Sequence, residues 1–145
     1  IKVEKLDVSK FNTSKVTSMQ GMFWYNYNIH DLDLSNFDTT NVTNMEEMFN
    51  RCGNLKSLNL ENFNTNNVTN MKGMFEFCRK LEKIYVGKMW NTDNVIDSSK
   101  MFDGDLLLLT GGAGTKWNST NTNDKNYARI DGGTESPGYF TEWID

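Results

Sequence analysis

Hydrophobic and polar positions recur along this chain with a period of 26 residues. The aligned apolar columns are Leu6, Leu32, Leu58 and Ile84; Val8, Leu34, Leu60 and Val86; Phe11, Phe37 and Phe63; Met19, Met45 and Met71; Met22, Met48 and Met74; Phe23, Phe49 and Phe75. A fixed period between about 20 and 50 residues is typical of stacked repeat proteins, in which each unit buries its apolar face against its neighbours. Such proteins usually bind ligands on exposed columns rather than in deep pockets.

Residues 32–57 show what each unit is expected to form. The alternation from Leu32 to Leu34 predicts a short strand with both leucines inward, and the turn residues at 38–41 follow it. The next apolar residues have the i, i+3, i+4, i+7 spacing of one helix face and are Met45, Met48, Phe49 and Cys52. Thr43 and Glu46 have capping-box spacing before this helix. The sequence therefore predicts an α/β fold, a solenoid of about four 26-residue strand-helix repeats.

A chain of 145 residues is long enough for one domain. We expect repeats near 1–26, 27–52, 53–78 and 79–105, with the repeat solenoid over 1–102 and an irregular C-terminal cap of the same domain over 103–145. The pattern is already under way at Val3, which aligns with Ile29, so we expect a fragment of a longer protein.

Charge and composition narrow the partners. The formal net charge is −4, with 15 basic and 19 acidic residues. The chain has no basic stripe, which argues against a nucleic-acid partner. No apolar run approaches the roughly 18 residues of a membrane span, so we expect no membrane insertion by this segment. We also expect a monomer. Cys52 and Cys78 occupy equivalent positions in adjacent repeats. A disulfide between them is possible in principle, but we expect buried free thiols, because positions on the helical side of the predicted solenoid stack too widely for a disulfide.

The sequence offers no catalytic or cofactor site. His30 is the single histidine, and no four-residue zinc set accompanies it. The glycines at 111–114 lack the spacing of a phosphate-binding loop. We therefore expect a protein that is not an enzyme and that needs no metal or cofactor.

The first candidate ligand-binding site is the exposed face of the predicted sheet. Its outward residues are Asp7, Asp33, Asn59 and Tyr85, flanked by Lys83 and Glu61. Parallel strands lie about 4.8 Å apart, so Asp7 and Asp33 would be like-charged neighbours. Their repulsion costs stability unless a partner or cation relieves it. The functional interpretation is a protein-binding surface anchored by Tyr85. An ordinary hydrated face is the alternative, and too few oxygen ligands converge for calcium to be favoured.

The second candidate site is the aromatic loop formed by Trp24, Tyr25 and Tyr27. Rings in a loop can stack on sugars or anchor a protein partner. Alternatively, they pack against an upstream repeat.

The run from Leu32 to Cys52 resembles the repeat of BspA-like bacterial surface proteins, and the segment 127–141 is similar to the one that closes such arrays. The resemblance implies a right-handed leucine-rich-repeat-like solenoid. It also implies a secreted, extracellular protein at the bacterial cell surface, without shared catalytic residues. We therefore expect adhesion or recognition of protein or glycan ligands on host or neighbouring cells. The alternatives are a structural stalk that presents another domain, and a carbohydrate-binding module.

Overall fold

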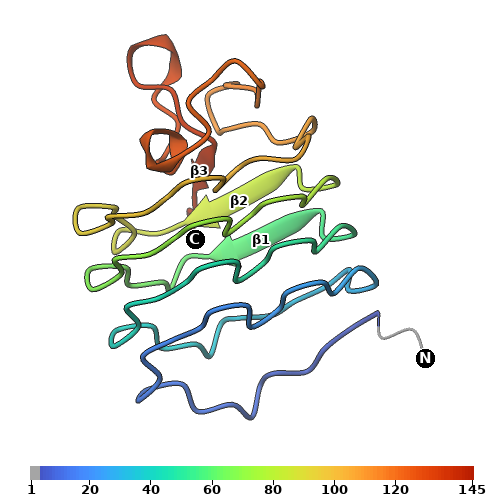
Figure 1. The fold of residues 1–145 in the computed structure, drawn as a ribbon, viewed down its shortest axis with the longest axis vertical. Coiled ribbons are helices and arrows are strands. Elements are labelled where there is room, and N and C mark those ends of the chain that lie inside the picture. Colours follow the sequence, from blue (N-terminus) through green and yellow to red (C-terminus); the bar gives the residue numbers. More distant parts are fainter. Residues whose placement is uncertain (1–3) are drawn as a thin grey trace.

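The computed structural model describes residues 4–145. Val3, on which the expectation of a longer protein rests, lies outside the described residues. Successive repeats run parallel and lie side by side in a stack (Figure 1). Parallel bridges at equivalent positions join Ser18 to Asn44, Asn44 to Asn70, and Asn70 to Asp97. The period of the sequence is therefore also the step from one layer of the stack to the next.

Regular secondary structure is sparse. One parallel sheet has the order β1-β2-β3, formed by β1 (Ser57–Leu60), β2 (Lys83–Val86) and β3 (Phe140–Glu142). Two short 3-10 helices, η1 (Lys125–Tyr127) and η2 (Gly133–Glu135), lie in the C-terminal region. Leu58 and Leu60 of β1 are buried while Ser57 and Asn59 are exposed, as a strand with one face on the core requires.

The prediction of a leucine-rich-repeat-like solenoid of strand-helix units is wrong, because residues 4–145 contain no α-helix. Residues 45–52 instead form a turn ribbon, a name we also use for the equivalent segments of the other repeats. The N–H groups of Met45, Glu47 and Phe49 donate to carbonyls of the next repeat, over 2.8, 2.8 and 3.0 Å. The N–H groups of Met48, Asn50 and Cys52 donate to carbonyls three residues back, and that of Glu46 donates to the side-chain Oδ1 of Asn44. A helix cannot form when every second N–H is committed to the neighbouring layer.

Backbone angles in the turn ribbon show the same departure from a helix. Glu47 and Arg51 have φ values of +55° and +65°, in the left-handed region that interrupts any right-handed helix. The predicted capping box is also absent. The Thr43 hydroxyl donates to the carbonyl of Thr17 in the preceding repeat at 3.2 Å. The four apolar residues of the supposed helix face are nevertheless all buried, so the spacing identified the inward side chains but not the backbone that carries them.

Stacked rings and buried thiols fill the core under the turn ribbons. Phe23, Phe49, Phe75 and Phe102 form a continuous column with centroid separations of 5.7, 5.7 and 5.5 Å. Cys52 and Cys78 are buried free thiols, which confirms the expectation for them. Their Sγ atoms donate to the carbonyls of Phe23 and Phe49. Burial raises the pKa of Cys52 to about 12, so the thiol is held in its neutral form.

Threonine side chains connect the layers at a second line of contact. The Thr39 hydroxyl donates to the carbonyl of Asn64 at 2.9 Å and accepts from the N–H of the same residue at 2.8 Å. Thr13 makes the same pair of bonds with Asp38, and Thr65 makes it with Asn91. Each threonine is buried. One side chain thus satisfies a donor and an acceptor of the next layer.

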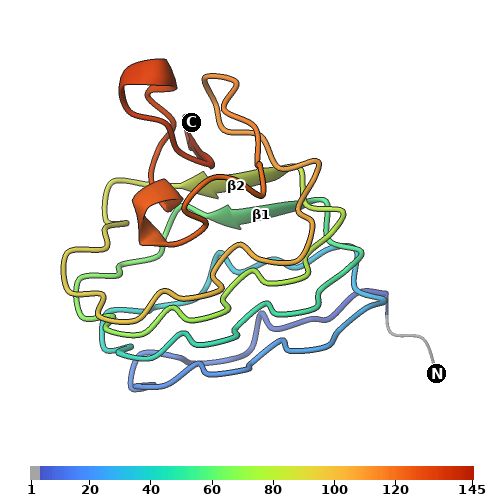
Figure 2. The same ribbon diagram turned by 45° about the horizontal axis from the view of Figure 1, so that its top comes forward.

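The C-terminal region, residues 103–145, lies against the last repeat (Figure 2). Trp90 donates its indole N–H to the carbonyl of Ala128 at 2.9 Å and meets the Phe140 ring edge-on at 5.2 Å. Tyr139 contacts Phe102, the last ring of the phenylalanine column, at 5.0 Å. Asp131 ties two loops of this region together by accepting from the N–H groups of Ala113, Thr115 and Gly133.

Candidate functional site

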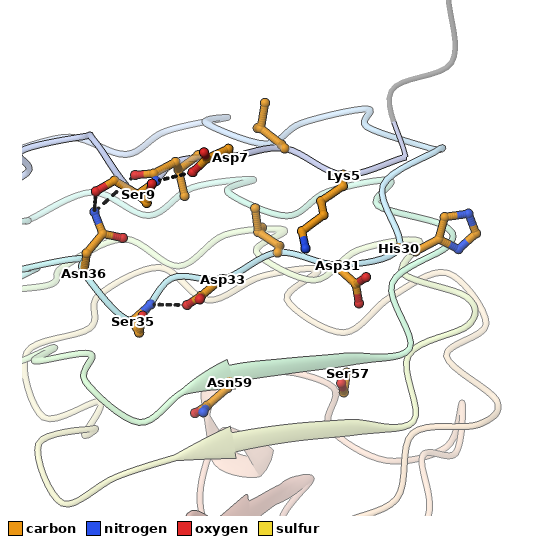
Figure 3. Close-up of a pocket in the computed structure, with 13 residues that line it drawn as sticks. Lys5, Asp7, Ser9, His30, Asp31, Asp33, Ser35, Asn36, Ser57 and Asn59 are labelled. Carbon is orange, nitrogen blue, oxygen red and sulfur yellow. Dashed lines mark hydrogen bonds between the residues drawn. The ribbon is translucent and has the colours of Figure 1, made fainter.

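An open groove of about 750 Å³ lies on the strand side of the first layers (Figure 3). Residues from three consecutive layers line it: Lys5, Leu6, Asp7, Val8, Ser9, His30, Asp31, Leu32, Asp33, Ser35, Asn36, Ser57 and Asn59. The first three residues of the predicted sheet-face column, Asp7, Asp33 and Asn59, are therefore brought together in one surface feature. Tyr85, the fourth, does not line the groove.

The groove coincides with a break in the backbone hydrogen bonds between layers. The N–H of His30 donates to the carbonyl of Glu4 at 2.9 Å, and that of Glu82 donates to Lys56 at 2.7 Å. The equivalent bond from Lys56 to His30 is not formed, and within residues 4–145 no strand pairs with 32–34. As a result Leu32 is only partly buried, whereas its equivalent in β1, Leu58, is fully buried.

Each polar residue of the column also makes a turn in its own layer. In each of them a side-chain oxygen accepts a hydrogen bond from the backbone N–H two residues ahead. The Ser9 N–H donates to Asp7 at 2.9 Å, the Ser35 N–H to Asp33 at 2.9 Å, and the Glu61 N–H to Asn59 at 3.0 Å. The first two bonds are visible in Figure 3. Asn59 shows that an uncharged amide suffices for this turn. The negative charge of the two aspartates is therefore not required by the fold.

The groove is anionic at neutral pH. Hydrogen bonds from the side chain and backbone of Ser9 lower the pKa of Asp7, and those from Ser35 lower the pKa of Asp33 in the same way. Asp31 is a third exposed carboxylate, and Lys5 is the one lysine among the lining residues. Within residues 4–145 no group of three or more His, Cys, Asp or Glu side chains is placed to hold a metal ion.

The remaining residues of the predicted sheet-face site lie elsewhere. Tyr85 on β2 is partly buried and packs edge-on against Trp143 at 5.3 Å. The Lys83 ammonium donates to the carbonyl of Thr110 at 3.0 Å, and Glu61 is half-buried. The C-terminal region thus occupies the half of the face where we placed the anchor.

Sequence reasoning did not place His30 or Asn36, which both line the groove, in a binding site. The Asn36 amide donates to the carbonyls of Val8 and Phe11, each at 3.1 Å. The equivalent Asn62 likewise donates to the preceding layer, at Ser35. The recurrence of asparagine at these two aligned positions is the signal that could have identified Asn36, whereas nothing in the repeat pattern points to His30.

The aromatic loop lies on a turn ribbon, across the core from the groove. Trp24, Tyr25 and Tyr27 are 51, 52 and 42% exposed. Their rings contact one another, with centroid separations of 5.2 Å between the first two and 4.9 Å between the last two. The Arg51 guanidinium lies 5.9 Å from the centre of the Tyr25 ring. Three neighbouring half-exposed rings form an apolar patch next to a cation.

Comparison with known proteins assigns the repeat region to a family. Residues 2–111 match the model of the family described as "Mycoplasma protein of unknown function, DUF285". The chain belongs to this family. The matched residues span the repeats, so the predicted resemblance holds at the coarser level of a family of repeat proteins. No curated protein and no solved structure matches the chain. Among residues 4–145, none of the helices is long and apolar enough to cross a membrane.

Proposed function

We propose that this protein is a recognition module of the bacterial cell surface that adheres to proteins of host or neighbouring cells through the strand-side groove. The observation that carries the proposal is the groove itself, which opens where the hydrogen bonds between layers are interrupted. A stalk gains nothing from such a break, because the break leaves Leu32 partly exposed and forgoes pairing with β1. Kinship with BspA-like surface proteins, suggested by the run from Leu32 to Cys52, supports the proposed location.

The lining of the groove favours an extended, basic segment as the bound part of the ligand. β1 is the edge strand of its sheet and faces the groove with Ser57 and Asn59. An extended peptide can satisfy backbone groups at such an edge. Three exposed carboxylates against one lysine attract lysine or arginine side chains and speed their encounter with the groove.

The experiment measures binding of the purified chain to immobilised extracellular-matrix proteins and to epithelial and bacterial cells, at low and high salt. The test variant is Asp7→Asn with Asp33→Asn. Asn59 makes the same turn with an amide, so this variant retains the local structure and loses two charges. The matched control is Asp38→Asn, because Asp38 makes an equivalent turn with Thr40 and does not line the groove.

We expect saturable binding that weakens with salt, falls about tenfold in the double variant and stays unchanged in the control. Equal affinity of the double variant and the control would contradict recognition through the groove. A folded chain that binds nothing on the panel would favour the stalk.

A further inference from the structure

A second hollow, of about 310 Å³, lies on the turn-ribbon side of the stack. It is lined by side chains of four layers: Trp24, Glu47, Asn50, Arg51, Lys72, Glu76, Phe77 and Lys100. Trp24, Asn50 and Glu76 occupy equivalent positions in successive repeats. While the buried core columns stay apolar from layer to layer, this column changes from an indole to an amide to a carboxylate. The hollow is therefore not a by-product of the repeat.

Asn50 gives this hollow a polar group without a partner. The side chain is only 4% exposed, and its Nδ2 donates to Oε2 of Glu76 at 3.1 Å. Its Oδ1 is buried and accepts no hydrogen bond. Buried polar atoms are nearly always paired, and an orphan acceptor is destabilising. A ligand that donates to Oδ1 would remove this deficit.

Gly73 leaves room for the two carboxylates. A Cβ at this position would lie 3.0 Å from Oε2 of Glu76 and 3.2 Å from Cγ of Glu47. The backbone there has φ +61°, which favours glycine. Burial raises the pKa of Glu76, with Asp103 and Glu47 adding to the effect and Lys100 opposing it. A hydrogen-bond donor that approaches this carboxylate would therefore meet a partly desolvated acceptor.

The chemistry of the lining selects a class of ligand. Glu47, Glu76 and Asn50 supply acceptors, whereas Arg51 and two lysines supply donors. A simple cation or anion would use only half of this set, but sugar hydroxyl groups both donate and accept. The half-exposed ring of Trp24 offers a flat face, which suits the C–H face of a pyranose. A volume near 300 Å³ is at the lower end of ligand pockets, so one sugar ring is the expected occupant.

We propose that this hollow binds one pyranose ring of a glycan, stacked on Trp24 and hydrogen-bonded to Asn50, Glu47 and Glu76. Tyr25 and Tyr27 do not line it. The ring of Phe77 is already covered by the Arg51 and Arg79 guanidinium groups, at 4.4 and 5.4 Å. Trp24 is therefore the stacking platform. Because Oδ1 of Asn50 is buried, a ligand reaches it only when neighbouring side chains move aside.

This site is independent of the strand-side groove, and the experiment keeps the two apart. The isotope-labelled chain is titrated with glucose, galactose, mannose, N-acetylglucosamine, N-acetylgalactosamine and fucose, and separately with butylammonium and sulfate. Nuclear magnetic resonance follows the Trp24 indole and the Asn50 side-chain amide. The variants are Trp24→Ala, Asn50→Ala and Glu76→Gln, and Trp143→Ala serves as the control because Trp143 lies against Tyr85 instead.

We expect at least one sugar to shift both the Trp24 and the Asn50 signals in a saturable manner. Trp24→Ala should weaken the affinity of the chain for this sugar by about tenfold or more, while Trp143→Ala should leave that affinity unchanged. The proposal is overturned if no sugar shifts these signals, or if only butylammonium or sulfate does. It is also overturned if the shifts arise at Tyr25 and Tyr27 and survive Asn50→Ala. Trp24→Ala keeps the test decisive if Asn50→Ala does not fold, because the Trp24 side chain is half-exposed.

Discussion

Replacing Thr39 by valine should destabilise the stack more than replacing it by serine. Valine has nearly the same shape but no hydroxyl, so it leaves both the N–H and the carbonyl of Asn64 without their partner in the preceding layer. Serine retains both bonds and loses only one methyl group. The comparison separates the hydrogen bonds that join the layers from the packing of the side chain.

The structure sets the expected size of each effect. A protein hydrogen bond contributes about 1 kcal/mol net, and a buried group left unpaired costs about 1–3 kcal/mol. Loss of two bonds in Thr39→Val should therefore lower the free energy of unfolding by about 2–4 kcal/mol. Thr39→Ser removes one buried methyl group, which is worth about 1 kcal/mol. Thr40 is exposed, and Thr40→Val should change stability by less than about 0.5 kcal/mol.

The assay is equilibrium unfolding in urea, monitored by fluorescence, with the midpoint and the slope fitted for each variant. Equal slopes would show that the variants unfold to the same extent, so that midpoints report stability. If Thr39→Val proves no less stable than Thr39→Ser, the hydroxyl does not hold the layers together and the reasoning fails.

Three further changes test other parts of the stack. Gly87→Ala should lower the free energy of unfolding by about 3 kcal/mol or more in the same assay, because the new Cβ would clash with the carbonyl oxygen of Glu61. At pH 8 a thiol reagent should modify Cys52 only as fast as the chain unfolds. Burial raises the pKa of this thiol in the folded chain to about 12. Its contribution to stability is therefore fully present below the pKa of the unfolded chain, about 8.5, and is lost as the pH rises towards the pKa of the folded chain. Labelling of the folded protein at pH 8 would contradict this. Asp131→Asn should lower the free energy of unfolding by about 2 kcal/mol and make that free energy less dependent on pH in acid. Although burial opposes it, hydrogen bonds hold the pKa of Asp131 below its usual range, so its contribution is present above about pH 4 and disappears as the pH falls through the lower folded value; an unchanged acid transition in calorimetry would count against this role.

The candidate site was predictable in part. Asp7, Asp33 and Asn59 could be placed together because equivalent positions of a 26-residue repeat fall in one column. Tyr85 satisfies the same rule but does not line the groove. Trp143, distant in sequence, packs against Tyr85, and no periodicity links the two residues. The groove was not predictable either, because it depends on backbone hydrogen bonds between layers that residues 32–34 do not form.

The backbone of the repeat shows where reading from sequence stops. The spacing of Met45, Met48, Phe49 and Cys52 fits a helix face, and it fits equally a series of turns that point the same residues inward. The choice between them is made by the N–H partners. In this chain every second N–H of the turn ribbon finds its acceptor in the next layer, and the local sequence does not contain that acceptor.

The sequence by itself determined the period and the inward columns, because side-chain burial follows from residue type and repeats with it. Only the tertiary structure decided that the ribbons are turns, that the layers separate beside Leu32, and that Asn50 keeps a carbonyl oxygen without a partner. Each of these depends on which hydrogen-bonding groups of neighbouring layers come within reach, and that is settled by how the layers stack rather than by any one layer's sequence.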